Sequence, residues 1–427
     1  MNKRLARAVI SSFRDPDQFT NRKRLQQFNR REWRHTLRWL DVSGLALYFL
    51  VRLKSLSIES AIPSAILAEL EQRLADNKLT SAILFQEFVR LNRAFLNADL
   101  PYLNLKGFTL VPEYCPAPAL RYQLDCDFLV EERSSSICRE LLADLGYLLT
   151  SSSGSVMEFK AGSGSPGHLR NLYKPKAIRS VEIHLCGSRV ADDLGFDSAA
   201  IARGKSLRLH DFSFPALCPE DMFIAQAAHL LRHVRSEWTR LSWLLEFRNF
   251  VLNRRLDDSY WVSLQESARQ IPSSRTAIAV AMNLATRAFG EFAPDQLTGW
   301  LNEGMPHSVD LWLKRYGDTV LLSDYPGTKL YLLLNRELDC NQEKATAANK
   351  RLFPLHPPAR ITFAVNTPVK PRLIATAHYW RYFLFRLRFH IKETSRYLFE
   401  SWRWKRLLNR HTHSLSSKGR CTIAVEG

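Results

Sequence analysis

The sequence predicts an α+β fold, in which a small mixed β-sheet with flanking helices is followed by a largely helical C-terminal region. Apolar residues recur at spacings of three and four before residue 100 and after about residue 219, as in amphipathic helices. Between these regions the period shortens to two, as in strands. A chain of 427 residues with 46% apolar side chains can build a sizeable core in two to three domains.

Four regions follow from this pattern. They are an N-terminal helical region (1–99), the sheet-containing core (100–215), a helical domain (216–350), and a Pro-rich connector with a basic, aromatic C-terminal helix (351–427).

The elements of the core each have a local signal. Helices are predicted over 30–54 and 62–98, and Pro63 suits the first turn of the second. A further helix runs from Ser134 to Gly146, because serines suit its N-cap and glycine is favoured just past a helix end. The expected strands are Tyr102–Leu105, Asp125–Val130, Val156–Phe159 and Val181–Leu185.

The C-terminal half is predicted to be helical. The expected helices cover 219–252, 258–290, 293–303, 308–324 and 374–410. Two connectors interrupt the pattern: a Pro-rich one from Pro354 to Pro371, and a glycine-serine run from Gly162 to Gly167. The second lacks the Gly-Lys-Ser/Thr ending of a phosphate-binding loop, so we expect it to be a mobile connector.

The net charge of +18 is concentrated at the two ends of the chain. Residues 1–54 carry 13 Lys/Arg against 4 Asp/Glu, and residues 370–427 carry 13 against 3, which leaves the centre close to neutral. Such ends attract polyanions, and both nucleic acid and an anionic membrane surface fit. Solvated helix faces are the alternative explanation.

The expected location is the cytoplasm. No window approaches the roughly 20 apolar residues that cross a bilayer, and the basic first 40 residues lack the apolar core of a secretory signal. Seven cysteines without a CxxC spacing favour neither a disulfide framework nor a zinc module. Peripheral attachment at the inner membrane surface stays open.

An Asp-x-Asp pair lies in the second expected strand. Because alternate side chains of a strand face the same way, Asp125 and Asp127 project from one face. Two carboxylates held this close favour a cation between them, and hard oxygen ligands are those that Mg²⁺ prefers. A third acid, Glu182, would complete a magnesium nucleotide site.

Three motifs occur in a fixed order. They are Leu105-Lys106-Gly107, Arg121-x-x-x-Asp125-x-Asp127 and Glu182-Ile183-His184. Over residues 40 to 250 their order and spacing resemble the nucleotidyltransferases of the DNA polymerase beta-like superfamily, and within it a poorly characterised bacterial group with a Leu-Lys-Gly strand end. The Asp-x-Asp pair alone would be a weak signal, because it also marks sugar-nucleotide glycosyltransferases.

The resemblance implies that the core is a nucleotidyltransferase core. It implies transfer of a nucleoside monophosphate from a nucleoside triphosphate, such as ATP, with pyrophosphate leaving. Asp125, Asp127 and Glu182 would be the catalytic residues and would hold two Mg²⁺ ions. The acceptor stays open among RNA, a protein, a sugar phosphate and another small molecule.

Four further residues of the motifs would bind the nucleotide. Lys106 and Arg121 would neutralise the triphosphate, and Gly107 would let the backbone approach a phosphate. His184 lies on the same strand face as the third acid, where it would contact the nucleotide or order the carboxylate. A structural hydrogen bond is the alternative role for this histidine.

Two departures from the wider superfamily are present. Phe108 stands where many members carry a serine, and 18 residues separate Gly107 from Asp125. The narrower bacterial group shares both departures, which indicates a variant loop. A catalytically silent scaffold that binds a nucleotide or a partner is the main alternative function. A glycosyltransferase is disfavoured, because little chain precedes the acid pair for a doubly wound nucleotide domain.

Two other segments contain residue types typical of binding sites. His229 and His233 share a helix face without an intervening glutamate, so packing near Trp238 and Trp243 is favoured over a zinc site. Glu246 lies where the related group commonly has an acid. The stretch 378–404 interleaves aromatic and basic residues, which fits single-stranded nucleic acid, a membrane interface, or packing on the protein itself.

Overall fold

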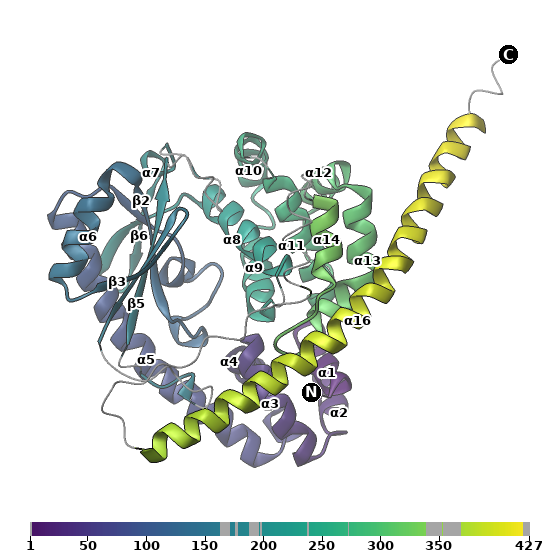
Figure 1. Ribbon diagram of the computed structural model, residues 1–427, viewed down its shortest axis with the longest axis horizontal. Helices are drawn as coiled ribbons and strands as arrows, with labels where there is room; N and C mark the ends of the chain where they lie inside the picture. Colours follow the sequence, from purple (N-terminus) through teal and green to yellow (C-terminus); the bar gives the residue numbers. More distant parts are fainter. Residues whose placement is uncertain are drawn as a thin grey trace. The chain divides into compact units, whose positions relative to one another are not determined.

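The computed structural model describes residues 2–162, 171–175, 178–187, 196, 199–236, 239–271, 273–338, 352 and 369–421 (Figure 1). These residues form a mixed seven-stranded sheet with flanking helices and a helical C-terminal region, which confirms the predicted fold class. Two compact units are present. Unit 1 is Met1–Arg232 with Arg240–Met305, and unit 2 is His233–Thr239 with Pro306–Gly427. The division at residues 99, 215 and 350 stays a prediction.

Four helices precede α5 (Ser64–Asn97), the long helix that packs on the sheet. They are α1 (Lys3–Arg14), α2 (Gln18–Leu25), α3 (Arg30–Ser43) and α4 (Ala46–Ser55). The single helix predicted over 30–54 is wrong, because α3 ends at Ser43 and is capped by Gly44. This glycine has a φ of +76°, a left-handed conformation that favours residues without a Cβ. Asn29 and Glu32 form a capping box at the start of α3.

The sheet has the strand order β3-β4-β5-β2-β1-β7-β6. Its strands are β1 (Tyr102–Asn104), β2 (Asp125–Glu131), β3 (Leu148–Ser153), β4 (Val156–Ala161), β5 (Arg179–Cys186), β6 (Lys205–Leu209) and β7 (Phe212–Ala216). β2 pairs in parallel with β5 and antiparallel with β1. The four predicted strands are confirmed as β1, β2, β4 and β5, whereas β3, β6 and β7 were missed.

One face of the sheet is covered by α5 (Ser64–Asn97) and α6 (Ser135–Asp144) (Figure 1). Phe128 and Ile183 point into this core, where Phe88 and Phe95 of α5 pack against the sheet. Each large apolar side chain buried in this way contributes about 1.5–3 kcal/mol to the driving force for folding. Because strand side chains alternate, the residues between them are directed to the opposite face.

The rest of unit 1 is mostly helical. It contains α7 (Ala199–Ala202), α8 (Pro219–Val234), α9 (Leu241–Asn253), α10 (Asp258–Gln270), α11 (Ser274–Phe289) and α12 (Asp295–Gly304), and the short 3₁₀ turns η1 (Glu59–Ala61), η2 (Gly107–Leu110), η3 (Pro118–Leu120) and η4 (Glu132–Ser134). The helices predicted over 219–252 and 258–290 are each two helices. The helix predicted over 293–303 is confirmed by α12.

Unit 2 contains α13 (His307–Leu321), α14 (Tyr331–Leu338) and α16 (Val369–Cys421). Glu400 of α16 accepts hydrogen bonds from Tyr316 Oη at 2.9 Å and Arg315 Nη2 at 3.1 Å, and Trp404 Nε1 donates to Glu337 at 2.9 Å. α13 and α16 confirm the helices predicted over 308–324 and 374–410. None of the described helices is both long and apolar enough to cross a bilayer. Most of the two predicted connectors, 163–167 and 354–368, lies outside the described residues.

Candidate active site

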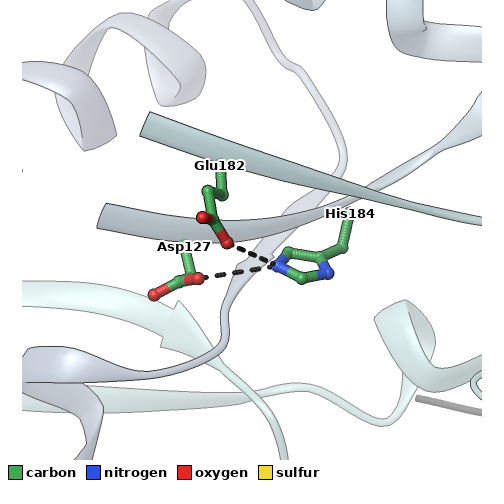
Figure 2. A group of neighbouring side chains, drawn as sticks. All are labelled: Asp127, Glu182 and His184. Atoms are coloured by element: carbon green, nitrogen blue, oxygen red, sulfur yellow. Dashed lines mark ion pairs between the residues drawn. The ribbon is translucent and has the colours of Figure 1, made fainter. Parts of the chain in front are cut away.

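The parallel register of β2 and β5 places Asp127 directly beside Glu182. His184 follows two residues later on β5, so its side chain lies on the same face as Glu182. Figure 2 shows the three side chains converging: Nε2 of His184 lies 3.5 Å from Asp127 Oδ1 and 3.6 Å from Glu182 Oε2. This face is opposite to the one that packs against α5, as the alternation in the sequence predicts.

Lys106 enters the same cluster from the chain that follows β1. Its Nζ donates a hydrogen bond to Asp127 Oδ1 at 2.7 Å, and both side chains are largely buried. Charged groups are stable at such a place only when they are paired. The predicted nucleotide-binding lysine is therefore an ion-pair partner of a predicted metal ligand in this structure.

The two aspartates of the pair have opposite electrostatic environments. Burial raises the pKa of Asp125 to about 7, and the charge of Asp127 adds to this effect while Lys106 partly offsets it. Burial also disfavours the charged form of Asp127, but Lys106 and His184 outweigh it and hold that pKa well below its ordinary value. One carboxylate is thus firmly ionised, whereas its neighbour titrates near neutrality.

His184 is buried between the two acids. Burial alone would lower the pKa of its imidazole, but Asp127 and Glu182 outweigh burial and raise this pKa above the ordinary value. Its Nε2 is buried and has no hydrogen-bond partner among the described residues, since both carboxylate contacts are longer than a good hydrogen bond. The two carboxylates thus favour the charged form of this imidazole, and Lys106 opposes it.

The same three residues fit a divalent metal ion. Asp127, Glu182 and His184 each offer a ligand atom, and these atoms lie within 4.8 Å of one another. A cation at this point would give the unpartnered Nε2 a partner. Carboxylate oxygens suit Mg²⁺ and Mn²⁺, and an imidazole adds affinity for transition metals. Asp125 lies outside this group of three, although its charge interacts with Asp127 and Glu182.

Gly107 lies at the start of η2, next to Lys106, and has a φ of +73°. A Cβ built on it would lie 2.5 Å from Oε1 of Gln123. The positive φ and the close contact with Gln123 are each sufficient to explain why a glycine occupies this position. Its predicted approach to a phosphate stays a prediction.

Arg121 lies in a buried network that the sequence did not reveal. Its Nε donates to Glu246 Oε2 of α9 at 3.3 Å, and Tyr48 Oη of α4 donates to the other oxygen of Glu246 at 2.8 Å. Burial raises the pKa of Glu246, and Arg121 and Tyr48 partly offset it. The Tyr48 hydroxyl also lies 3.0 Å from Cys115 Sγ. Arg121 therefore has an internal carboxylate partner besides its electrostatic interaction with Asp125.

The sequence did not indicate that Glu246 bonds Arg121, and it did not identify Tyr48 as a residue of the site. The only available signal was the presence of an acid at position 246 in the resembling group. His229 packs edge-on against Trp243 with ring centroids 4.7 Å apart, which agrees with the predicted packing role. Trp238 lies outside the described residues.

A carboxylate cluster on two adjacent parallel strands, with a lysine beside it, fits enzymes that transfer phosphate groups. The chain belongs to a family described as uncharacterised nucleotidyltransferases, whose family model matches residues 29–290. The matched region contains the whole cluster, the Arg121 network and α9. A search of the curated proteins gave no match. The predicted family is therefore confirmed, and with it a general role in nucleotidyl transfer.

Proposed function

We propose that the protein transfers a nucleoside monophosphate from a nucleoside triphosphate, such as ATP, to an acceptor with release of pyrophosphate. The observation that carries the proposal is the convergence of Asp127, Glu182 and His184 beside Lys106 in a member of this family. An acceptor oxygen would form a bond to the α-phosphorus while the bond from that phosphorus to the bridging oxygen breaks. Pyrophosphate would take the leaving electron pair.

The acids would act on the two reacting oxygens. Asp125, Asp127 and Glu182 would hold two Mg²⁺ ions, which supply positive charge to the attacking and leaving oxygens. Glu182 has a side chain that is 31% exposed, against 4% for Asp127, so an incoming acceptor can reach it. Glu182 would accept the acceptor's proton, directly or through a water molecule.

The basic residues would hold the triphosphate. Lys106 can exchange its bond to Asp127 for a phosphate oxygen once a metal compensates that carboxylate. Arg121 bonds Glu246 through Nε, and its terminal nitrogens would bond phosphate oxygens. The backbone at Gly107 would approach a phosphate, and neutral His184 would complete the metal's ligands or contact the nucleotide.

The remaining features of the proposal concern partners and location. RNA, a protein or a small molecule would serve as the acceptor. The work would take place in the cytoplasm, with the basic ends contacting nucleic acid or an anionic membrane at the inner membrane surface. The net charges of both ends support an anionic partner.

Pyrophosphate release tests the reaction. Purified protein would be incubated with each of the four ribonucleoside triphosphates, Mg²⁺ or Mn²⁺, and cell extract as a source of acceptor. We expect release with at least one triphosphate, and Asp127→Asn should lower it on the order of 10²–10³-fold, because the charge that stabilises the transition state is lost.

A matched control lies on the same strand. Glu131 is also on β2 and bonds Arg133 near the strand's far end, so Glu131→Gln should leave release within about twofold. Equal release by wild type and Asp127→Asn would contradict the proposal. If neither release nor metal-dependent binding of triphosphate occurs, the silent scaffold becomes the better explanation.

A further inference from the structure

Helix α16 exposes a row of large apolar side chains along one face. Trp380, Leu384, Leu387, Ile391, Leu398 and Trp402 follow one another at intervals of three, four or seven residues. They are between 44 and 61% exposed. Residues at these intervals share one face of a helix, so the six form an apolar stripe about six turns long, with Ser395 between Ile391 and Leu398.

A different face of α16 packs within unit 2. Glu393, Tyr397, Ser401 and Trp404 are buried, and their spacing of three and four places them on a second face. Glu393 accepts a hydrogen bond from Thr328 at 2.8 Å. The helix therefore has an inward face with partners and, separate from it, the exposed stripe.

The charges of α16 favour an anionic partner. Residues 376–410 contain nine Lys/Arg and two acids, and both acids, Glu393 and Glu400, bond to side chains of unit 2. The basic residues beside the stripe follow the same helical spacing. They are Arg381, Arg388, Lys392, Arg403 and Arg406.

We infer that the stripe of α16 docks on an anionic membrane surface and lies in its interface. Leucine, isoleucine and tryptophan gain by entering the boundary between headgroups and acyl chains, and the adjacent arginines reach lipid phosphates. Single-stranded nucleic acid would use the aromatics for stacking but would leave the aliphatic side chains unused. A second copy of the helix would bring two strongly basic faces together. This inference does not depend on the transferase activity.

Vesicle flotation tests the inference with the full chain. We expect binding to phosphatidylcholine vesicles that contain about 30% phosphatidylglycerol to exceed binding to phosphatidylcholine alone by about tenfold or more, and to weaken with salt. Ile391→Glu/Leu398→Glu should lower binding by about tenfold or more, because it places two carboxylates in the stripe.

The control variant makes the same change elsewhere. Leu256 and Val262 are exposed apolar residues of unit 1, at 94% and 58%, and Leu256→Glu/Val262→Glu should bind vesicles as wild type does. Circular dichroism and the thermal midpoint would show that both variants fold. Acyl chains carrying bromine should quench tryptophan emission, and Trp380→Phe/Trp402→Phe should reduce this quenching.

Two results would overturn the inference: wild-type protein that does not bind vesicles, and vesicle binding that the stripe variant retains. In the first case, two further measurements would reassign the stripe. Loss of binding to a single-stranded RNA oligomer in the stripe variant would assign it to nucleic acid, and conversion of a dimer to a monomer in sedimentation velocity would assign it to a second copy.

Discussion

Two separate constraints act on Gly107, and they can be tested apart. The backbone has a φ of +73°, which residues with a Cβ rarely adopt, and a Cβ would lie 2.5 Å from Gln123 Oε1. The first constraint belongs to the backbone itself, whereas the second depends on a flexible side chain. The position also follows Lys106, so a change of backbone conformation here would displace the lysine from Asp127.

Gly107→Ala should lower the free energy of unfolding by about 1–2 kcal/mol, because left-handed backbone is strained for alanine. Urea denaturation would measure the change. Adding Gln123→Ala should relieve the contact and recover only part of the loss, since the strained φ remains. Gly107→Ala with wild-type stability would show that the backbone at this position relaxes without cost.

The aspartate pair shows how far residue identity determines a site. The motif predicted that Asp125 and Asp127 share a strand face, and the structure agrees. Their different pKa values could not be predicted, because Lys106 bonds only Asp127 and is 21 residues away in sequence. Such differences depend on tertiary contacts, which a local pattern does not contain.

At the scale of elements, the interior strands β1, β2, β4 and β5 were predicted, whereas the two edge strands β3 and β6 were missed together with β7. In β2 and β5 every second residue belongs to the core cluster: Cys126, Phe128 and Val130 in β2, and Val181, Ile183 and Leu185 in β5. β3 at the sheet's edge has the sequence LLTSSS and is exposed along its whole length. No burial pattern marks such a strand, because its partner supplies the backbone hydrogen bonds without a core.

The link between α4, α9 and Arg121, which directly follows η3, is the main feature that sequence could not reveal. Arg121 is 125 residues from Glu246, which in turn is 198 residues from Tyr48. One buried carboxylate thus joins three elements next to the Asp-x-Asp strand. We interpret Glu246 as a positioning residue for Arg121, since it does not itself belong to the metal-binding group.

A double-mutant cycle on Arg121 and Glu246 tests this interpretation. Glu246→Leu should destabilise the protein by about 3–5 kcal/mol, because Arg121 would be left buried without its partner. Arg121→Met/Glu246→Leu should recover much of this stability, as measured by urea denaturation. The double variant should still have a raised KM for the triphosphate in pyrophosphate release, since the guanidinium is gone.

The conservative variant Glu246→Gln distinguishes a role of Glu246 in positioning Arg121 from a role in packing. Glu246→Gln keeps the hydrogen bond from Tyr48 but removes the charge that holds Arg121, so KM should rise more than kcat falls. If the destabilisations of the two single changes simply add in the double variant, the pair is not coupled and the interpretation fails.

At the scale of the whole molecule, chemistry and docking are assigned to different units. The carboxylate cluster, Lys106 and the Arg121 network all lie in unit 1, whereas the stripe of α16 lies in unit 2. A ligand of one site should therefore raise the free energy of unfolding of its own unit and leave that of the other unit unchanged.

His390 of α16 gives unit 2 its own dependence on pH. Burial lowers the pKa of this histidine to about 4, and the charges of Lys329 and Arg386 add to the effect. The unfolded chain binds a proton at His390 more strongly than the folded chain does. The contribution of the neutral imidazole to the free energy of unfolding is therefore fully present above pH 6.5, and it is lost as the pH falls from about 6.5 towards 4.

Differential scanning calorimetry should therefore resolve two transitions that respond to different variables. Mg²⁺ or Mn²⁺ should raise only the unit 1 transition, which Gly107→Ala identifies by lowering it. Between pH 6.5 and 4, His390→Gln should reduce the fall of the unit 2 transition and leave the other unchanged. At pH 7.5 the same variant should have no pH-linked effect, which controls for a change in packing. A single transition that metal and His390→Gln both move would show that the two units unfold as one.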